Sequence, residues 1–173
     1  MSEEETIIFG VPVPSTDPAF LTIVVIHILL GIICITSGFI AVMSKKGKGN
    51  HSRWGKWYYA TLFLIFVTVI PLSIMRWPAN NHLLVLGILS FASGHYGKSN
   101  ARTKRPGWSR RHTISMAASY ILLLTAFYVD NGKNLPLWNL FPQYFFWIFP
   151  AIVGIPITVY TWLKHPLNVE GKP

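Results

Sequence analysis

The chain has 173 residues, of which 51% are hydrophobic, 14% are aromatic and only 12% are charged. Soluble domains carry roughly 25% charged residues, so this composition indicates an integral membrane protein and excludes an ordinary soluble core. We interpret the net charge of +9 as lysines and arginines that set the topology and face anionic lipid, and not as a nucleic-acid-binding surface. The single cysteine, Cys34, excludes an internal disulfide and haem attached through two thioethers.

Residues 1–19 form an acidic tail that contains Pro12, Pro14 and Pro18. A secretory signal needs a basic start and a small-residue cleavage site after its apolar core, and this segment has neither. We therefore expect an uncleaved tail that lies outside the cytoplasm.

Five apolar segments follow, and together they form one predicted membrane domain over residues 20–164. A transmembrane helix needs roughly 20 apolar residues, and the third segment is short, so a re-entrant loop is an alternative there. The fifth segment contains Pro150 and Pro156, which predict a kinked or broken helix. The segments cover residues 20–43, 57–75, 80–96, 113–129 and 144–163, and a predicted cytoplasmic tail covers 165–173.

Basic residues concentrate in the loops after the first and third segments, whereas the loops after the second and fourth carry only Arg76 and Lys133. If all five segments span, both basic loops lie on one side, which the positive-inside rule makes cytoplasmic. We therefore predict an all-α integral membrane bundle of five transmembrane helices, with the N-terminus outside and the C-terminus in the cytoplasm. The basic residues are Lys45, Lys46, Lys48, Arg53 and Lys56 in the first loop, and Lys98, Arg102, Lys104, Arg105, Arg110 and Arg111 in the second.

The first two segments match the next two in layout. Each pair has a histidine towards the outer side, then a Ser-Gly pair, a basic loop and a second histidine; these are His27 and His51, then His82 and His112. The layout predicts a parallel repeat of two helix hairpins, followed by a fifth helix. Small residues on the faces that carry His27 and His82 either let helices pack closely or leave room for a flat macrocycle.

An imidazole inside a membrane is a functional hypothesis by default, and histidine is a common axial ligand of haem iron. The layout predicts two bis-histidine haem b sites, an outer one between His27 and His82 and an inner one between His51 and His112. This alternation on four successive helices resembles the cytochrome b561 family, which implies transmembrane electron transfer. One alternative is that His27 forms a hydrogen bond across helices while the other three are interfacial. Another is a site for a different metal or a small ligand.

The turn Asp130-Asn131-Gly132 is the second polar feature. It is interpreted either as a helix end, with Gly132 at a left-handed cap position, or as an outward-facing ligand or proton site with Lys133 and Arg76 as partners. The predicted spans contain no Asp or Glu. This absence disfavours an ion-coupled transporter and a pair of catalytic carboxylates.

A further set of residues runs along both halves of the chain: His27, Gly31, Gly38, Lys46-Gly47, His51, Gly55, His112, Met116, Ser119-Tyr120, 124–132, 135–138, Pro142, Phe146-Trp147, Pro150 and 154–156. In these residues the chain resembles an uncharacterised family of small bacterial multi-pass membrane proteins that carry a domain of unknown function. The resemblance implies a bacterial cell (inner) membrane location and supplies no activity.

The leading specific hypothesis is therefore b-type haem binding and transmembrane electron transfer through the histidines. A rival hypothesis is a non-catalytic membrane partner or assembly factor that uses its outer loops and its basic inner face. A small-solute transporter is a third.

Overall fold

The computed structural model describes residues 6–8, 11–13, 15–47 and 49–163. A short antiparallel hairpin of β1 (Thr6–Ile8) and β2 (Val11–Val13) precedes five long helices. The predicted tail 165–173 lies outside the described residues. The helices are α1 (Pro18–Met43), α2 (Asn50–Met75), α3 (Asn81–Thr103), α4 (Trp108–Asn131) and α5 (Gln143–Leu163), and the 3-10 turns η1 (Gly132–Asn134) and η2 (Trp138–Leu140) join α4 to α5.

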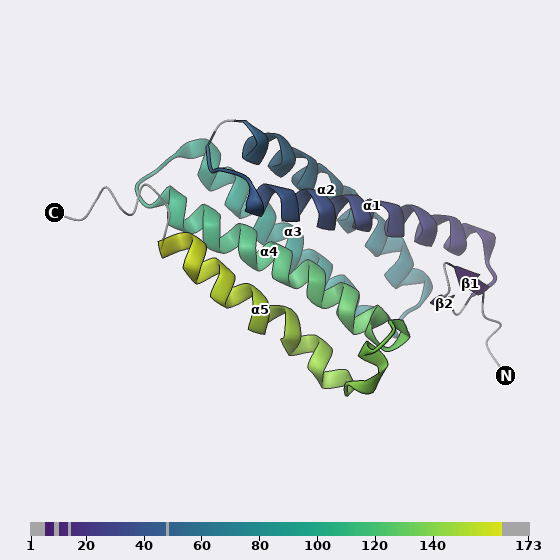
Figure 1. Cartoon of the computed structure of the whole chain (residues 1–173). Helices are drawn as coiled ribbons and strands as arrows, with labels where there is room; N and C mark the ends of the chain where they lie inside the picture. Colours follow the sequence, from purple (N-terminus) through teal and green to yellow (C-terminus); the bar gives the residue numbers. More distant parts are fainter. Residues whose placement is uncertain (1–5, 9–10, 14, 48, 164–173) are drawn as a thin grey trace.

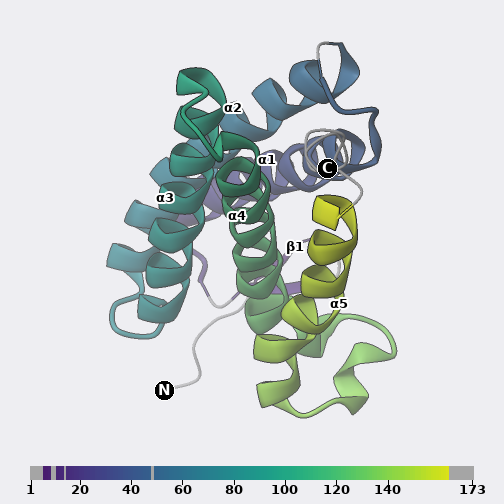
Figure 2. The same cartoon turned by 90° about the vertical axis from the view of Figure 1, so that its left-hand side faces the viewer.

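The helices form an up-and-down bundle, so the predicted all-α fold is confirmed (Figure 1). Helices α1 and α2 pack along one another as one hairpin, and α3 and α4 pack as a second. Figure 2 shows α4 between α3 and α5. The loops that join α1 to α2 and α3 to α4 lie at the same end of the bundle (Figure 1), which we call the basic end because both carry the clustered lysines and arginines.

Four helices, α1, α2, α4 and α5, are long and apolar enough to cross a membrane. Their outer faces carry large exposed apolar side chains, for example Ile32 and Phe39 on α1, each 58% exposed. Surfaces of this kind are stable only against lipid or a partner. Helix α3 has 23 residues, which at 1.5 Å per residue gives a length of about 35 Å. It is one continuous helix and not a loop, although it is less apolar than the other four.

Three helix ends extend by five or more residues beyond the apolar segments that mark them in the sequence. Helix α2 begins at residue 50 instead of 57, α3 continues to 103 instead of 96, and α4 begins at 108 instead of 113. Lysine and arginine are good helix formers, so a polar stretch can continue a helix that hydropathy alone would end. Gly49 and Gly107 precede α2 and α4 with φ of 113° and 72°, a backbone geometry that favours glycine.

Local capping explains where α1 begins. The Asp17 carboxylate accepts hydrogen bonds from the backbone N–H groups of Ala19 (2.7 Å) and Phe20 (3.4 Å). Pro18 occupies the first helical position, where its missing N–H costs nothing. The chain therefore enters its first apolar helix directly from the acidic tail.

One prediction of local geometry is wrong, and one alternative of another is excluded. Gly132 has φ of −55° and continues into η1, so it is not a left-handed cap. A Cβ at this glycine would lie 2.6 Å from the Phe146 ring, so close packing against α5 explains the residue. The prolines at 150 and 156 do not break α5, which runs as one helix from Gln143 to Leu163.

The core lies between α1, α2 and α4. Cys34, Tyr58, Leu62, Ile65 and Leu123 form one buried cluster. The small-residue faces discussed above are mostly closed by this core. A Cβ at residue 38 would lie 2.6 Å from the Tyr120 ring, and one at residue 94 would lie 2.7 Å from Leu62. At these two positions the glycines serve close helix packing and leave no room for a macrocycle.

Candidate functional site

His51 and His112 lie together at the basic end of the bundle. Each belongs to the first turns of its helix, α2 or α4, and their ring centroids are 6.2 Å apart with planes at 89°. Nδ1 of His51 lies 2.8 Å from the carbonyl oxygen of Ala41 on α1, and Nδ1 of His112 lies 2.9 Å from that of Gly97 on α3. Each histidine therefore bonds the backbone of the preceding helix in its own hairpin. We call His51 and His112 the inner histidine pair.

These contacts select one tautomer for both rings. A carbonyl oxygen can only accept a hydrogen bond, so each Nδ1 carries the proton and donates it. In the neutral ring the lone pair then belongs to Nε2. Metal-ligating histidines usually donate their second ring N–H to a carboxylate or a backbone carbonyl, which fixes the ring and raises its basicity. The inner histidine pair has this arrangement on both sides.

The spacing of the two rings also suits one metal ion. Two metal–nitrogen bonds of about 2 Å each account for about 4 Å. The ring centroids are 6.2 Å apart, which leaves about 2 Å. This remainder equals the distance of about 1 Å from ring centroid to Nε2, counted once for each ring. A single ion with both Nε2 atoms as ligands would need the two rings at about this separation.

Two glycines, one near the pair in the sequence and one bonded to it, differ in how closely they are packed. Gly55 lies one turn after His51 and is half-buried, yet no atom lies within 4 Å of where its Cβ would be. By contrast, a Cβ at Gly97 would lie 2.9 Å from the Met116 sulfur. Two imidazoles held in this way are a donor set that could hold one metal ion or the iron of a haem. The two hollows found among the described residues are lined elsewhere, so a macrocycle would have to displace side chains beside the pair.

The predicted outer pair has separate partners. Nδ1 of His27 lies 2.7 Å from Oγ1 of Thr68 on α2, which is a hydrogen bond across helices. His82 begins α3, and its ring centroid lies 5.9 Å from that of Trp147 on α5. No contact described here joins His27 to His82. The structure therefore brings together the inner histidine pair and gives the outer histidines different surroundings.

The second predicted site lies at the opposite end of the bundle. Asp130 is within electrostatic reach of His82 and Arg76. The Asn131 amide donates to the carbonyl of Phe127 (3.1 Å) and to Asp130 (3.3 Å). Arg76 is thus near the acid as predicted, and His82 is an additional neighbour that the sequence did not suggest.

Lys133, the other predicted partner of Asp130, has a different role. Its Nζ donates to the backbone carbonyls of Asn139 (3.2 Å) and Phe141 (2.5 Å). Both acceptors belong to the connection between α4 and α5, so Lys133 holds this connection in place.

Comparisons of the chain with known protein families, with curated proteins and with solved structures found no match. Among the described residues, no group of three or more His, Cys, Asp or Glu side chains is arranged to hold a metal ion. Two such side chains, as in the inner histidine pair, are therefore the largest grouping that the contacts described above bring together.

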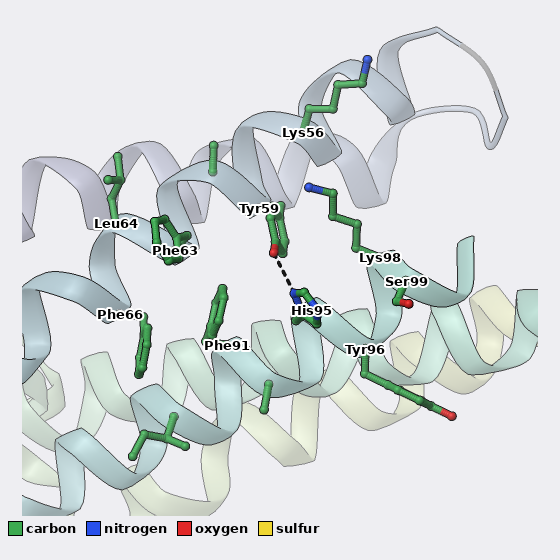
Figure 3. A pocket seen from close by; sticks show the side chains of 13 residues that line it. Lys56, Tyr59, Phe63, Leu64, Phe66, Phe91, His95, Tyr96, Lys98 and Ser99 are labelled. Atoms are coloured by element: carbon green, nitrogen blue, oxygen red, sulfur yellow. Dashed lines mark hydrogen bonds between the residues drawn. The ribbon is translucent and has the colours of Figure 1, made fainter. Parts of the chain in front are cut away.

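A groove between α2 and α3 was not predicted from the sequence (Figure 3). It has a volume of about 1040 Å³ and lies mainly between aromatic side chains of the two helices. The signal that could have revealed it is a stripe on α2, where Tyr59, Phe63 and Phe66 recur at helical spacing. The facing positions on α3 are Phe91 and His95.

Proposed function

We propose that this protein is a multi-pass membrane protein that binds haem b through His51 and His112 and carries electrons within the membrane. The observation that carries the proposal is the inner histidine pair, whose ring centroids are 6.2 Å apart and whose Nδ1 atoms both contact backbone carbonyls. A haem iron with two imidazole ligands supplies one-electron transfer when it is bound.

Two backbone carbonyls of the chain would orient the histidine ligands. The carbonyls of Ala41 and Gly97 orient the two rings and keep the proton on Nδ1. Since each carbonyl belongs to the preceding helix of a hairpin, the pair also ties the four helix ends together. The basic residues around this end supply a positive field, which favours the more electron-rich, reduced state of a nearby centre.

The proposed setting is a bacterial cell membrane, with the basic end in the cytoplasm, the N-terminus outside and α3 crossing together with the other four helices. Support for this orientation comes from the two basic loops, which lie at one end of the bundle (Figure 1). Support for a repeat of two hairpins comes from His51 and His112, which make the same kind of contact in each.

The test is the optical spectrum of the purified protein after expression with ample haem. We expect a Soret band and a reduced-minus-oxidised α-band in the wild-type protein. His51→Asn and His112→Asn each keep an N–H donor near the position of Nδ1, so they should fold, but they lack Nε2 and should lose both bands. His95→Asn, an exposed histidine on α3, is the matched control and should keep the spectrum.

Two results would overturn the proposal: a colourless wild-type protein, or full bands in both asparagine variants. Bands that depend on His27 and His82, and not on the inner histidine pair, would move the site to the outer end. A colourless, folded protein would favour the rival function of a non-catalytic membrane partner.

A further inference from the structure

The groove between α2 and α3 has an apolar floor. The rings of Phe66 and Phe91 stack with centroids 4.9 Å apart and planes at 5°, and Phe63 lies 5.6 Å from Phe91. The walls are open to the side, since Phe63, Leu64 and Ile88 are each more than two-fifths exposed. In a membrane, this opening faces lipid acyl chains.

The end of the groove nearest the basic loops is polar and positively charged. Lys56 of α2 and Lys98 of α3 extend from facing helices at this end (Figure 3). Nζ of Lys98 lies 3.5 Å from the centroid of the Tyr59 ring, which holds the ammonium group in place. The Tyr59 hydroxyl lies 2.9 Å from Nδ1 of His95. Lys98, Tyr59 and His95 therefore form one polar cluster beside the aromatic floor, and Lys56 adds a second cation to the lining at this end of the groove.

No acidic residue lines this groove among the described residues. Lys98 is also within electrostatic reach of Arg102, a like charge four positions further along α3. Like charges at this spacing on a helix destabilise it. The sequence has no Asp or Glu between residues 18 and 129, so α1, α2 and α3 contribute no carboxylate as a counter-ion. Among the described residues, the chain itself therefore offers these lysines no carboxylate inside the groove, which leaves the site complementary to an anionic ligand.

The length of the groove indicates what kind of anionic molecule would fill it. From Lys56 to Phe66 are ten residues of α2, or about 15 Å of helix rise. This distance is half of the roughly 30 Å hydrocarbon core of a bilayer. The groove therefore runs from a charged end through one leaflet, as an acyl chain does. We propose that it binds one anionic phospholipid, with its phosphate group near Lys56 and Lys98 and an acyl chain over Phe63, Phe66 and Phe91.

Native mass spectrometry of the detergent-purified protein tests this proposal. We expect one phosphatidylglycerol to bind, and phosphatidylcholine with the same chains to bind much more weakly. The double variant Lys56→Gln/Lys98→Gln should bind phosphatidylglycerol about tenfold more weakly or worse, because each lysine near an anionic headgroup contributes to the attraction. Lys45→Gln, which removes an exposed charge from the neighbouring loop, is the matched control and should bind as the wild type does.

Further measurements distinguish a lipid phosphate from free phosphate, and a loss of binding from a loss of folding. Inorganic phosphate should not displace the lipid, because it cannot use the aromatic floor; displacement at similar concentrations would indicate a free-phosphate site and overturn the proposal. Lys98→Arg keeps the charge and should keep binding, and Phe91→Ala should weaken it. Equal retention of the two lipids, or undiminished phosphatidylglycerol binding by the folded double variant, would also overturn it.

Discussion

The Tyr58 hydroxyl lies 2.8 Å from Oγ of Ser119, and this contact joins α2 of the first hairpin to α4 of the second. Both residues are buried, with 2% and 0% of their surface exposed. The Ser90 hydroxyl, from α3, donates to the Ser119 carbonyl at 2.8 Å. Three helices thus meet at one polar point inside the bundle. Hydrogen bonds between helices in membranes contribute about 0.6 kcal/mol on average and up to about 2 kcal/mol.

Tyr58→Phe should lower the free energy of unfolding by about 1–2 kcal/mol. The ring stays in place, but Ser119 loses its partner on α2 and a buried hydroxyl is left unpaired. Equilibrium unfolding in mixed detergent micelles would measure the change. The control is Tyr59→Phe, because the bond from Tyr59 to His95 is exposed and its loss should cost less.

A double-mutant cycle with Ser119→Ala separates the bond from the packing of the two side chains. If the bond matters, the two single effects should sum to more than the effect of the double variant, because each removes the same contact. Strictly additive effects would show that the two hydroxyls act independently.

Gly38 and Gly31 make a matched pair on α1. Gly38→Ala should destabilise the protein by about 1–3 kcal/mol, as overpacking does, because its Cβ would lie 2.6 Å from the Tyr120 ring and 2.9 Å from that of Tyr58. Gly31→Ala meets nothing within 4 Å and should be neutral or stabilising by up to about 1 kcal/mol, since alanine is the better helix former. Thermal unfolding in detergent would compare the two; equal losses would contradict the packing at Gly38.

The sequence predicts the helices well because the apolar runs and the clustered lysines are local features. It predicts helix ends less well, since a helix that leaves the hydrocarbon can continue through polar residues such as Lys98 and Arg102. The Gly132 error has a similar origin. A glycine after a helix usually supplies a left-handed turn, and only the position of Phe146 on α5 reveals that this one serves close packing.

The sequence predicted part of the candidate site. The equivalent positions of His51 and His112 in two hairpins suggested a pair, and the structure brings their rings together; haem binding stays a prediction. The different partners of His27 and His82 depend on how α2 and α5 pack, which no local pattern encodes. The groove was missed for the same reason, because its two walls belong to helices whose facing sides are set by packing.

Cys34 provides a probe of the native core. Its side chain is fully buried, and its thiol contacts the Tyr58 carbonyl at 3.7 Å. We expect no reaction with a small, membrane-permeant maleimide in the folded protein and complete reaction after denaturation in sodium dodecyl sulfate. The labelled fraction can be read from the mass of the intact protein. Rapid labelling of the native protein would contradict the packing of α1 against α2.

The crossing of α3 can be tested with new cysteines in a Cys34→Ala background. Lys45→Cys and Arg105→Cys lie in the two loops at the basic end, whereas Ala79→Cys and Asn134→Cys lie at the opposite end, and all four positions are exposed. In sealed right-side-out vesicles, an impermeant maleimide should label Ala79→Cys and Asn134→Cys only. Permeabilised vesicles should expose the other two, which controls for reactivity. If Lys45→Cys and Arg105→Cys reported opposite sides, α3 would not cross, and the inner histidine pair could not form at one membrane face.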